Sequence, residues 1–269
     1  MRRKIVIVVA SIAIGSPALA KDGELHTFHC LHGCPLGAPA TNDTIVREIY
    51  TLSSNDLTKM ADWVAYRITP ESIGTSEGRD WQSDPALSAD ETLTETSYKD
   101  APADLHIDRG HQAPLASFSG TPFADQTNIL SNITPQASAL NQGAWVRLET
   151  RERALAQTSK AAVYVYTGPL FERMMKPLPN GGEMHRVPSG YWKVVATANG
   201  RMSAFIFDQN TPRRASHCDG RTTLFEVQLR SRLTLFPMAP PTPIRSLDVD
   251  LGCATPLPPP TPPSEITTR

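Results

Sequence analysis

The chain has 269 residues, of which 40% are hydrophobic, and its 26 Lys and Arg side chains stand against 27 Asp and Glu, for a formal net charge of −1. This length is sufficient for one large domain with a single core, and no linker divides it. The balanced charge excludes a protein that binds nucleic acid through a broad basic face.

The N-terminus has the three parts of a secretory signal peptide. Residues 2–4 are basic, residues 5–14 form an apolar run, and residues 18–20 form a small-residue cleavage site. The run is too short for a membrane span, so we expect cleavage near Ala20 and a secreted or periplasmic product; the alternative is a retained anchor. Cleavage leaves 23 basic against 27 acidic side chains, so positive charge must be local. These arginines could supply it: Arg79, Arg109, Arg147, Arg151 and Arg153.

The first half of the mature chain has a strand-like pattern. Residues 21–41 are polar and contain Gly and Pro, which indicates an irregular lead-in. Residues 45–52 and 63–68 are rich in β-branched and aromatic side chains and are predicted strands. Residues 70–94 form a long connection rich in Gly, Ser, Asp and Pro. Residues 105–107 alternate in polarity and predict the end of another strand.

The second half begins with the strongest helical pattern of the chain. Apolar residues recur at helical spacing between Ala137 and Thr158, so we predict a helix there. Further on we predict strands at 162–167, 191–198 and 202–207, a hairpin turn at Asn199-Gly200, and a second helix over 223–233 that begins at Thr222 or Thr223. Residues 21–254 are predicted to form one domain, and residues 255–269 a proline-rich, disordered tail.

Four cysteines in an exported chain indicate disulfides. Their spacing suggests the pairs Cys30–Cys34 and Cys218–Cys253. The second pair closes a loop of about 35 residues and is expected to contribute roughly 3–4 kcal/mol to stability. A zinc knuckle is the alternative for the first pair, because His29 and His32 lie beside its cysteines.

The residues that indicate chemistry are concentrated between 108 and 149. Asp108-Arg109-Gly110-His111 is followed about thirty residues later by Asn141-Gln142-Gly143-Ala144-Trp145-Val146-Arg147-Leu148-Glu149. A histidine can accept a proton from water, and an amide oxygen can bind a hard cation. With a carboxylate and several guanidinium groups, these are the parts that metal-assisted hydrolysis of a phosphodiester requires.

These motifs resemble those of the DNA/RNA non-specific endonucleases of the ββα-metal superfamily. The resemblance extends from Cys30 to Cys253 and includes Thr134-Pro135-Gln136 and Thr167-Gly168-Pro169-Leu170. It implies a mixed α/β (α+β) fold in which helices flank a central antiparallel sheet that carries a ββα-metal site. The chain departs from the family pattern at Gln228 and Arg232, which replace a Glu and a turn Gly and leave the end of the last helix uncertain.

The resemblance assigns a role to each central residue of the motif. It implies that His111 is the general base and that Asn141 is the direct protein ligand of one Mg²⁺ per site, for which Mn²⁺ could substitute. It implies that Glu149 binds this ion through water; taken alone, Glu149 would more readily form an ion pair with Arg153. Asp108 is expected to shape the site without binding the metal.

Three arginines are predicted to contact the nucleic acid. The resemblance implies that Arg79 touches the scissile phosphate, and Arg109 and Arg153 are weaker candidates for the same task. Trp145, Tyr191 and Trp192 could stack on bases, but packing in the core is the more common use of such residues.

The predicted function is that of a secreted, Mg²⁺-dependent endonuclease that cuts DNA and RNA with little sequence or sugar specificity and leaves 5′-phosphate ends. The resemblance also suggests a homodimer, and the residues themselves leave the oligomeric state open. Two other classes are compatible with the sequence. One is a secreted phosphodiesterase for small diesters, and the other is a catalytically silent nucleic-acid-binding protein.

Overall fold

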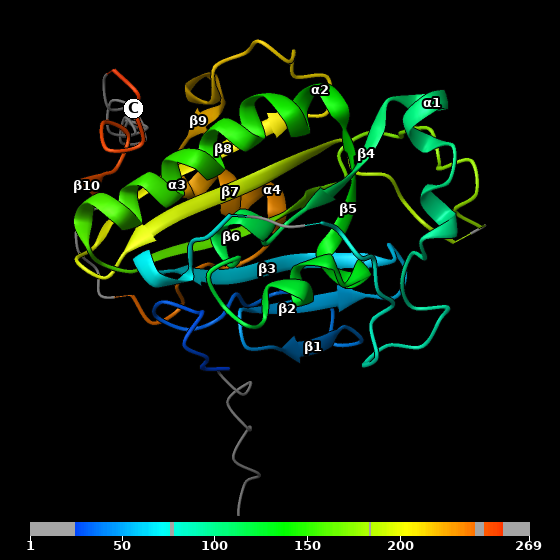
Figure 1. Cartoon of the computed structure of the whole chain (residues 1–269), viewed down its shortest axis with the longest axis horizontal. Coiled ribbons are helices and arrows are strands. Elements are labelled where there is room, and N and C mark those ends of the chain that lie inside the picture. The colour runs from blue at the N-terminus through cyan, green and yellow to red at the C-terminus, as the bar shows by residue number, and fades with distance from the viewer. Residues whose placement is uncertain (1–24, 76–77, 183, 240–244, 255–269) are drawn as a thin grey trace, which may run out of the picture.

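The computed structural model describes residues 25–75, 78–182, 184–239 and 245–254 (Figure 1). The expected signal peptide, residues 1–20, and the proline-rich tail, residues 255–269, lie outside the described residues. Within these described ranges, no helix has both the length and the apolar character needed to cross a membrane.

One large sheet forms the centre of the molecule. Its strands are ordered β1-β2-β3-β6-β7-β8-β10, and β9 also pairs with β8. All neighbours are antiparallel except β10, which runs parallel to β8. The strands are β1 Asp43–Val46, β2 Tyr50–Asn55, β3 Met60–Ile68, β6 Val163–Leu170, β7 Gly190–Thr197, β8 Arg201–Asp208, β9 Arg221–Thr222 and β10 Arg245–Ser246.

A second, two-stranded sheet and the helices complete the fold. β4, Ile107–His111, pairs antiparallel with β5, Ile133–Ala137. The long helix α3, Val146–Ser159, crosses one face of the large sheet, and α4, Leu224–Ser231, packs on the other face (Figure 1). Among the described residues, the remaining α-helices are the short α1, Ala101–Leu105, and α2, Ser138–Leu140. The predicted mixed fold with a central antiparallel sheet and flanking helices is therefore confirmed.

The strands of the second half agree closely with their predicted positions, but two predictions from the first half are wrong. Residues 45–52 are not one strand, because a turn in which Arg47 N donates to Tyr50 O (2.9 Å) separates β1 from β2. Residues 105–107 are not continuous strand either. Leu105 ends α1, His106 takes a left-handed conformation (φ 54), and β4 begins at Ile107.

The helix predicted from Ala137 to Thr158 is present over that range but is not regular. Between α2 and α3, residues 141–145 form a π-type turn, and Gly143 has non-helical backbone angles (φ −115, ψ −117). A methyl group added at Gly143 would lie 2.8 Å from the carbonyl oxygen of Arg213. A glycine is therefore needed where the loop at residue 213 meets this segment.

The second predicted helix matches α4, and Thr223 is its cap, because Thr223 Oγ1 accepts a hydrogen bond from Glu226 N (3.1 Å). The departures from the family pattern fall at its other end. Arg232 takes a left-handed conformation (φ 61) directly after the helix. Gln228 Oε1 accepts from Leu235 N (2.8 Å), so the side chain that departs from the family pattern secures the chain after the helix.

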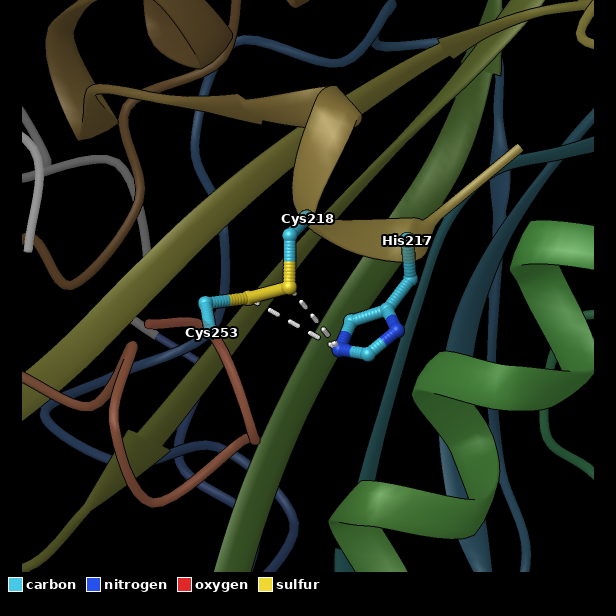
Figure 2. A group of neighbouring side chains, drawn as sticks. All are labelled: His217, Cys218 and Cys253. Carbon is cyan, nitrogen blue, oxygen red and sulfur yellow. Dashed lines mark hydrogen bonds between the residues drawn. A yellow bond between two sulfur atoms is a disulfide. The ribbon is translucent and has the colours of Figure 1, made fainter. Parts of the chain in front are cut away.

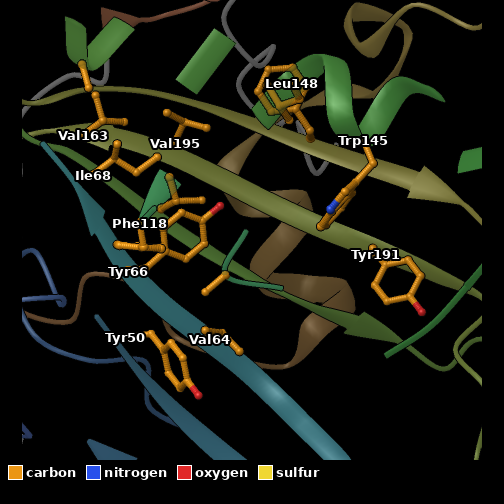
Figure 3. Close-up of a cluster of buried hydrophobic side chains, with 14 of the residues drawn as sticks. Tyr50, Val64, Tyr66, Ile68, Phe118, Trp145, Leu148, Val163, Tyr191 and Val195 are labelled. Atoms are coloured by element: carbon orange, nitrogen blue, oxygen red, sulfur yellow. The ribbon is translucent and has the colours of Figure 1, made fainter. Parts of the chain in front are cut away.

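The core divides between the two faces of the large sheet because successive strand residues point to opposite sides. On β3, Val64 and Tyr66 pack toward α3, whereas Trp63 and Ala65 pack toward α4. The face under α3 holds the cluster in Figure 3, which includes Trp145 and Leu148 from the helical segments. On β7, Tyr191 and Val195 point to this same face. Lys193 lies between them in the strand, so its side chain is directed toward α3.

Both predicted disulfides are present, Cys30–Cys34 and Cys218–Cys253. In this state the sulfurs of Cys30 and Cys34 are bonded to each other, so neither is a thiolate that could bind zinc. His29, a ligand in that zinc alternative, is instead buried, with its Nδ1 2.9 Å from Thr51 Oγ1 and its Nε2 3.2 Å from the Glu48 carbonyl oxygen.

Candidate active site

The structure brings all six predicted non-cysteine site residues to one cavity. This cavity has a volume of about 580 Å³ and lies between the β4–β5 pair, the start of α3 and the loop that follows residue 78. Its polar and charged lining includes Arg79, Asp108, Arg109, His111, Asn141, Gln142, Glu149 and Arg153. Residues separated by as much as 74 positions in the sequence therefore face one cavity.

The frame of the cavity is a ββα unit made of β4, β5 and the helical segments that follow. His111 is the last residue of β4, and Asn141 comes directly after α2, which continues from β5. Gly110 is paired with Thr134 in this hairpin, and a methyl group added at Gly110 would lie 2.5 Å from Gln136 Oε1. The glycine of the Asp-Arg-Gly-His motif is thus required by close packing beneath the site.

His111 is half-buried and held by a single side-chain hydrogen bond. Its Nε2 lies 3.0 Å from Asn128 Oδ1. Because an amide oxygen only accepts, Nε2 is the protonated nitrogen and Nδ1 keeps the lone pair. Burial lowers the pKa of His111 to about 4, and the positive charge of Arg79 acts in the same direction, against the hydrogen bond to Asn128. The imidazole is therefore neutral at pH 7 and can accept a proton.

Asn141 is oriented by Asp108. The Asn141 amide nitrogen Nδ2 donates to Asp108 Oδ2 (2.9 Å), and so does Gln142 Nε2 (2.8 Å), while Ser138 Oγ donates to Asp108 Oδ1 (2.5 Å). With one N–H of its NH₂ group donated to Asp108, the Asn141 side chain is fixed in orientation, and its carbonyl oxygen remains available as an acceptor or ligand. Asp108 is thus occupied by three donors, which agrees with its expected role of shaping the site.

Glu149 belongs to a buried charged cluster under α3. Lys193 Nζ lies 3.8 Å from Glu149 Oε1 and 3.2 Å from Glu152 Oε1, and it also donates to Tyr66 OH (3.2 Å). Tyr66 OH in turn donates to Glu152 Oε2 (3.0 Å). The ion pair of Glu149 is thus with Lys193, and not with Arg153 as the local spacing suggested. Burial raises the pKa of Glu149 to about 7, although the charge of Lys193 opposes that shift.

The three predicted contact arginines differ in how firmly they are held. Arg79 is exposed at the edge of the cavity. Arg109 Nη2 donates to the Glu95 carbonyl oxygen (3.0 Å), and its guanidinium lies over the rings of Trp81 (5.3 Å) and Tyr98 (5.6 Å). Arg153, which is half-buried, donates from Nη2 to Thr150 Oγ1 (3.1 Å).

Two other arginines near the motif are not at the site. Arg147 Nη2 donates to the Arg213 carbonyl oxygen (2.6 Å), and the guanidinium of Arg151 packs against Gly252. Both side chains therefore support the loops behind α3. The sequence favoured packing in the core over stacking on bases for three aromatic residues. The structure agrees, because Trp145, Tyr191 and Trp192 are each at most 1% exposed.

Three residues of the site were not found by sequence reasoning. Asn128 lies in a short helical turn with no motif around it, and Lys193 lies in a strand whose neighbours are aromatic and aliphatic. Trp81 follows Arg79 by two positions, and its ring centroid lies 5.4 Å from that of His111. Its proximity to Arg79 in the sequence was the only available signal.

Comparison with known proteins identifies the class to which this site belongs. The family model of the DNA/RNA non-specific endonucleases matches residues 33–240. The chain is 46% identical over 236 residues to a nuclease of Serratia marcescens, covering 86% of this chain and 88% of that protein. It is 30% identical over 226 residues to nuclease C1 of Cunninghamella echinulata var. echinulata, covering 74% and 85% of the two chains.

The fold has solved relatives as well. A chain of the crystal structure of the EndoG/EndoGI complex superposes with a TM-score of 0.65 at 22% identity, covering 78% of this chain and 92% of that one. At this identity the likeness concerns the fold alone. The match to the family model and the identity to the Serratia enzyme show more: the chain belongs to the DNA/RNA non-specific endonuclease family and is a nuclease.

Proposed function

We propose that the protein is a secreted, Mg²⁺-dependent endonuclease that hydrolyses DNA and RNA to products with 5′-phosphate ends. The observation that carries the proposal is the convergence of a neutral His111, the oriented amide of Asn141 and the carboxyl group of Glu149 on one cavity. The names of the relatives support nuclease activity, whereas the metal, the ends and the export are our inference.

Magnesium fits the donors that this cavity offers. Asn141 and Glu149 present oxygen atoms, which Mg²⁺ prefers, and Mn²⁺ accepts the same ligands. Because Asp108 occupies the amide nitrogen of Asn141, the amide oxygen remains for a cation, and Glu149 would bind that ion through water. The bound ion would supply positive charge for the phosphoryl group and for the departing 3′ oxygen.

The chain's own groups carry the remaining steps. The lone pair on Nδ1 of His111 takes a proton from water as the water attacks phosphorus. Asn128 keeps the other ring nitrogen protonated and so fixes which nitrogen is basic. Arg79 adds positive charge at the phosphate, with Arg109 and Arg153 as further contacts in the cavity. A water nucleophile needs no ribose 2′-hydroxyl, so both DNA and RNA are expected substrates.

Low specificity follows from the kind of contact that the cavity can make. Guanidinium groups and a cation bind phosphates, which carry no base information. Trp81 is half-buried at the cavity and could lie against a sugar or a base, and such stacking tolerates any base.

Export and domain boundaries are part of the proposal. Disulfide formation at both cysteine pairs supports an oxidising compartment. We propose cleavage of the signal peptide near Ala20, a catalytic domain over residues 21–254 and a separate tail. Mass determination of the exported protein tests the cleavage site, and sedimentation tests the homodimer that the family resemblance suggests.

Cleavage of plasmid DNA by the purified protein, with Mg²⁺ and with EDTA, tests the central claim. We expect Mg²⁺-dependent nicking and then fragments, EDTA inhibition, and loss of several orders of magnitude in rate for His111→Ala with unchanged melting. A silent binding protein would shift the DNA without cutting it. A small-diester phosphodiesterase would cleave an aryl phosphodiester and leave the plasmid intact. Products with 2′,3′-cyclic phosphate ends on RNA would contradict the water mechanism.

A further inference from the structure

His217 lies directly against the disulfide between Cys218 and Cys253 (Figure 2). Its Nε2 is 3.5 Å from Cys218 Sγ and 3.7 Å from Cys253 Sγ, and it also lies 2.9 Å from the Leu251 carbonyl oxygen. None of these residues lines the cavity that holds His111. One imidazole nitrogen thus faces two sulfur atoms at a place separate from the proposed catalytic chemistry.

The distances resemble those between ligands of a tetrahedral zinc ion. With Zn–S of about 2.3 Å and Zn–N of about 2.0–2.1 Å, a tetrahedral ion separates a nitrogen and a sulfur ligand by roughly 3.6 Å. Nε2 of His217 already stands at this separation from both sulfurs. Only the two sulfurs must move apart, from a covalent bond to a separation of roughly 3.8 Å around such an ion.

Backbone hydrogen bonds hold these residues independently of the sulfur–sulfur bond. The turn His217–Gly220 is capped by Ser216, whose Oγ accepts from Cys218 N (3.2 Å). Cys253 N donates to the Asp248 carbonyl oxygen (2.8 Å). His217 is 6% exposed and Cys253 2% exposed, so the surroundings are packed. Opening of the disulfide would therefore leave the three side chains near one another.

We propose that His217, Cys218 and Cys253 form a redox-dependent site for a thiophilic cation such as Zn²⁺. A dithiol reductant transfers two electrons and two protons to the disulfide, which becomes two thiols while the dithiol becomes a cyclic disulfide. Zn²⁺ then binds two thiolates and releases two protons to solvent. The imidazole binds through Nε2 after its proton moves to Nδ1. These three ligands leave a fourth position for water.

Only the reduced chain therefore binds a cation at this place. In the oxidised chain the sulfurs are bonded to each other and have no charge for a cation. In the reduced chain the two thiolates and the imidazole form a Cys₂His set, which favours Zn²⁺ over Mg²⁺ because thiolates are soft ligands. The site therefore differs in metal preference from the cavity at Asn141, which offers oxygen ligands.

Titration with Co²⁺ tests the proposal, because thiolate ligands give this ion a charge-transfer band and tetrahedral geometry gives it intense visible bands. The protein should carry Cys30→Ser and Cys34→Ser, since His29, His32 and those cysteines could also bind metal after reduction. The dithiol is removed by anaerobic gel filtration before Co²⁺ is added. We expect one Co²⁺ per chain with both signatures, displaced by Zn²⁺, and neither signature in the oxidised protein.

The matched variant is His217→Phe in the same background, with free thiols counted to show that both cysteines are reduced. Its affinity for Co²⁺ should fall at least tenfold, and Zn²⁺ should raise the melting temperature of the reduced parent but not of this variant. Equal affinity in the two proteins would remove His217 from the site. Absence of the thiolate band in the reduced parent, whether folded or unfolded, would overturn the proposal. A thiolate band in the oxidised protein would overturn its redox dependence.

Discussion

The pKa values of His111 and Glu149 shift in opposite directions although both side chains line the same cavity. Burial opposes charge, so it lowers the pKa of the imidazole to about 4 and raises that of the carboxyl group to about 7. At neutral pH the base is ready to accept a proton, whereas the carboxyl group is partly protonated. A cation bound at Asn141 would favour the ionised carboxylate and so bring both groups to the state that the proposed mechanism needs.

Replacement of Asn128 should separate two effects on His111. In Asn128→Ala the imidazole loses the acceptor that fixes its protonated nitrogen, so we expect kcat to fall about 10- to 100-fold. In Asn128→Asp an acceptor remains, but its negative charge favours the imidazolium, so protonation of His111 should begin at higher pH and add to the loss of rate in acid. Steady-state kinetics across pH for both variants, with melting temperature as the control for folding, provides the measurement. Wild-type rates in Asn128→Ala would show that this hydrogen bond does not position the base.

The acidic limb of wild-type activity should report Glu149. As the pH falls, Glu149 takes up its proton first, near pH 7 without a cation and lower with one, whereas His111 stays neutral well below pH 6.5. The variant Glu149→Gln should be slower at pH 8 but should keep its rate down to about pH 5. A pH profile at saturating Mg²⁺ tests this. An acidic limb that is identical in the variant and in wild type would assign the titration to His111.

At the scale of single elements, β7 and α3 are joined by charge as well as by apolar packing. Lys193 is fully buried at the middle of β7, and its ammonium group lies between Glu149 and Glu152 of α3 and 4.1 Å from the centre of the Trp145 ring. Two carboxyl groups share one cation, so the arrangement is sensitive to the loss of that cation. It also fixes the side of α3 that carries Glu149 against the sheet.

Lys193→Met should therefore destabilise the fold by about 3–5 kcal/mol, because it leaves a buried carboxylate without its cation. Adding Glu152→Gln to this variant should restore part of the stability, since a neutral amide costs less to bury. Urea unfolding of the single and double variants measures both effects. If the double variant is less stable than Lys193→Met, the charge of Glu152 is not what Lys193 balances.

The sequence predicted much at this scale, and the exceptions have physical causes. Strand periodicity and turn residues predicted both ends of β7 and of β8 to within one residue of the observed ends. They predicted the ends of β6 to within three residues. The π-type turn at Gly143 was not predicted, and the backbone that packs against this glycine belongs to Arg213, far away in the sequence. Asn128 was missed for a similar reason: it meets His111 across 17 residues that show no regular pattern.

Family motifs predicted the cavity better than local spacing did. The spacing of Glu149 and Arg153 favoured an ion pair along the helix, but Lys193 from β7 takes that position. In the same way, five arginines around the motif were expected to supply local positive charge, yet Arg147 and Arg151 contact loops behind the helix. Which neighbour a charged side chain meets depends on the packing of distant segments, and a single sequence carries little information about that.

At the scale of the whole molecule, the two disulfides constrain very different lengths of chain. Cys30 and Cys34 are 4 residues apart, whereas Cys218 and Cys253 are 35 apart. The second bond joins the loop after β8 to the segment after β10, at the edge of the large sheet. Its loss frees a longer unfolded loop and should therefore cost more stability.

We expect Cys218→Ser/Cys253→Ser to lose about 3–4 kcal/mol and Cys30→Ser/Cys34→Ser to lose less. Thermal melting of the two double variants beside wild type is the measurement, with nuclease activity recorded to show that each still folds. Equal melting temperatures for wild type and Cys218→Ser/Cys253→Ser would mean that native-state strain offsets the entropy of the unfolded chain.

The disulfide between Cys218 and Cys253 can form only at a late stage of export. In a chain exported N-terminus first, Cys253 emerges after every strand of the large sheet and after the whole cavity. The segment it anchors packs Gly252 against Arg151 of α3, the helix that carries Glu149. Under the export proposed above, the back of that helix is completed last, after the chain has left the cytoplasm. Under the same proposal, the nucleic acids of the producing cell are kept apart from the finished nuclease until export is complete.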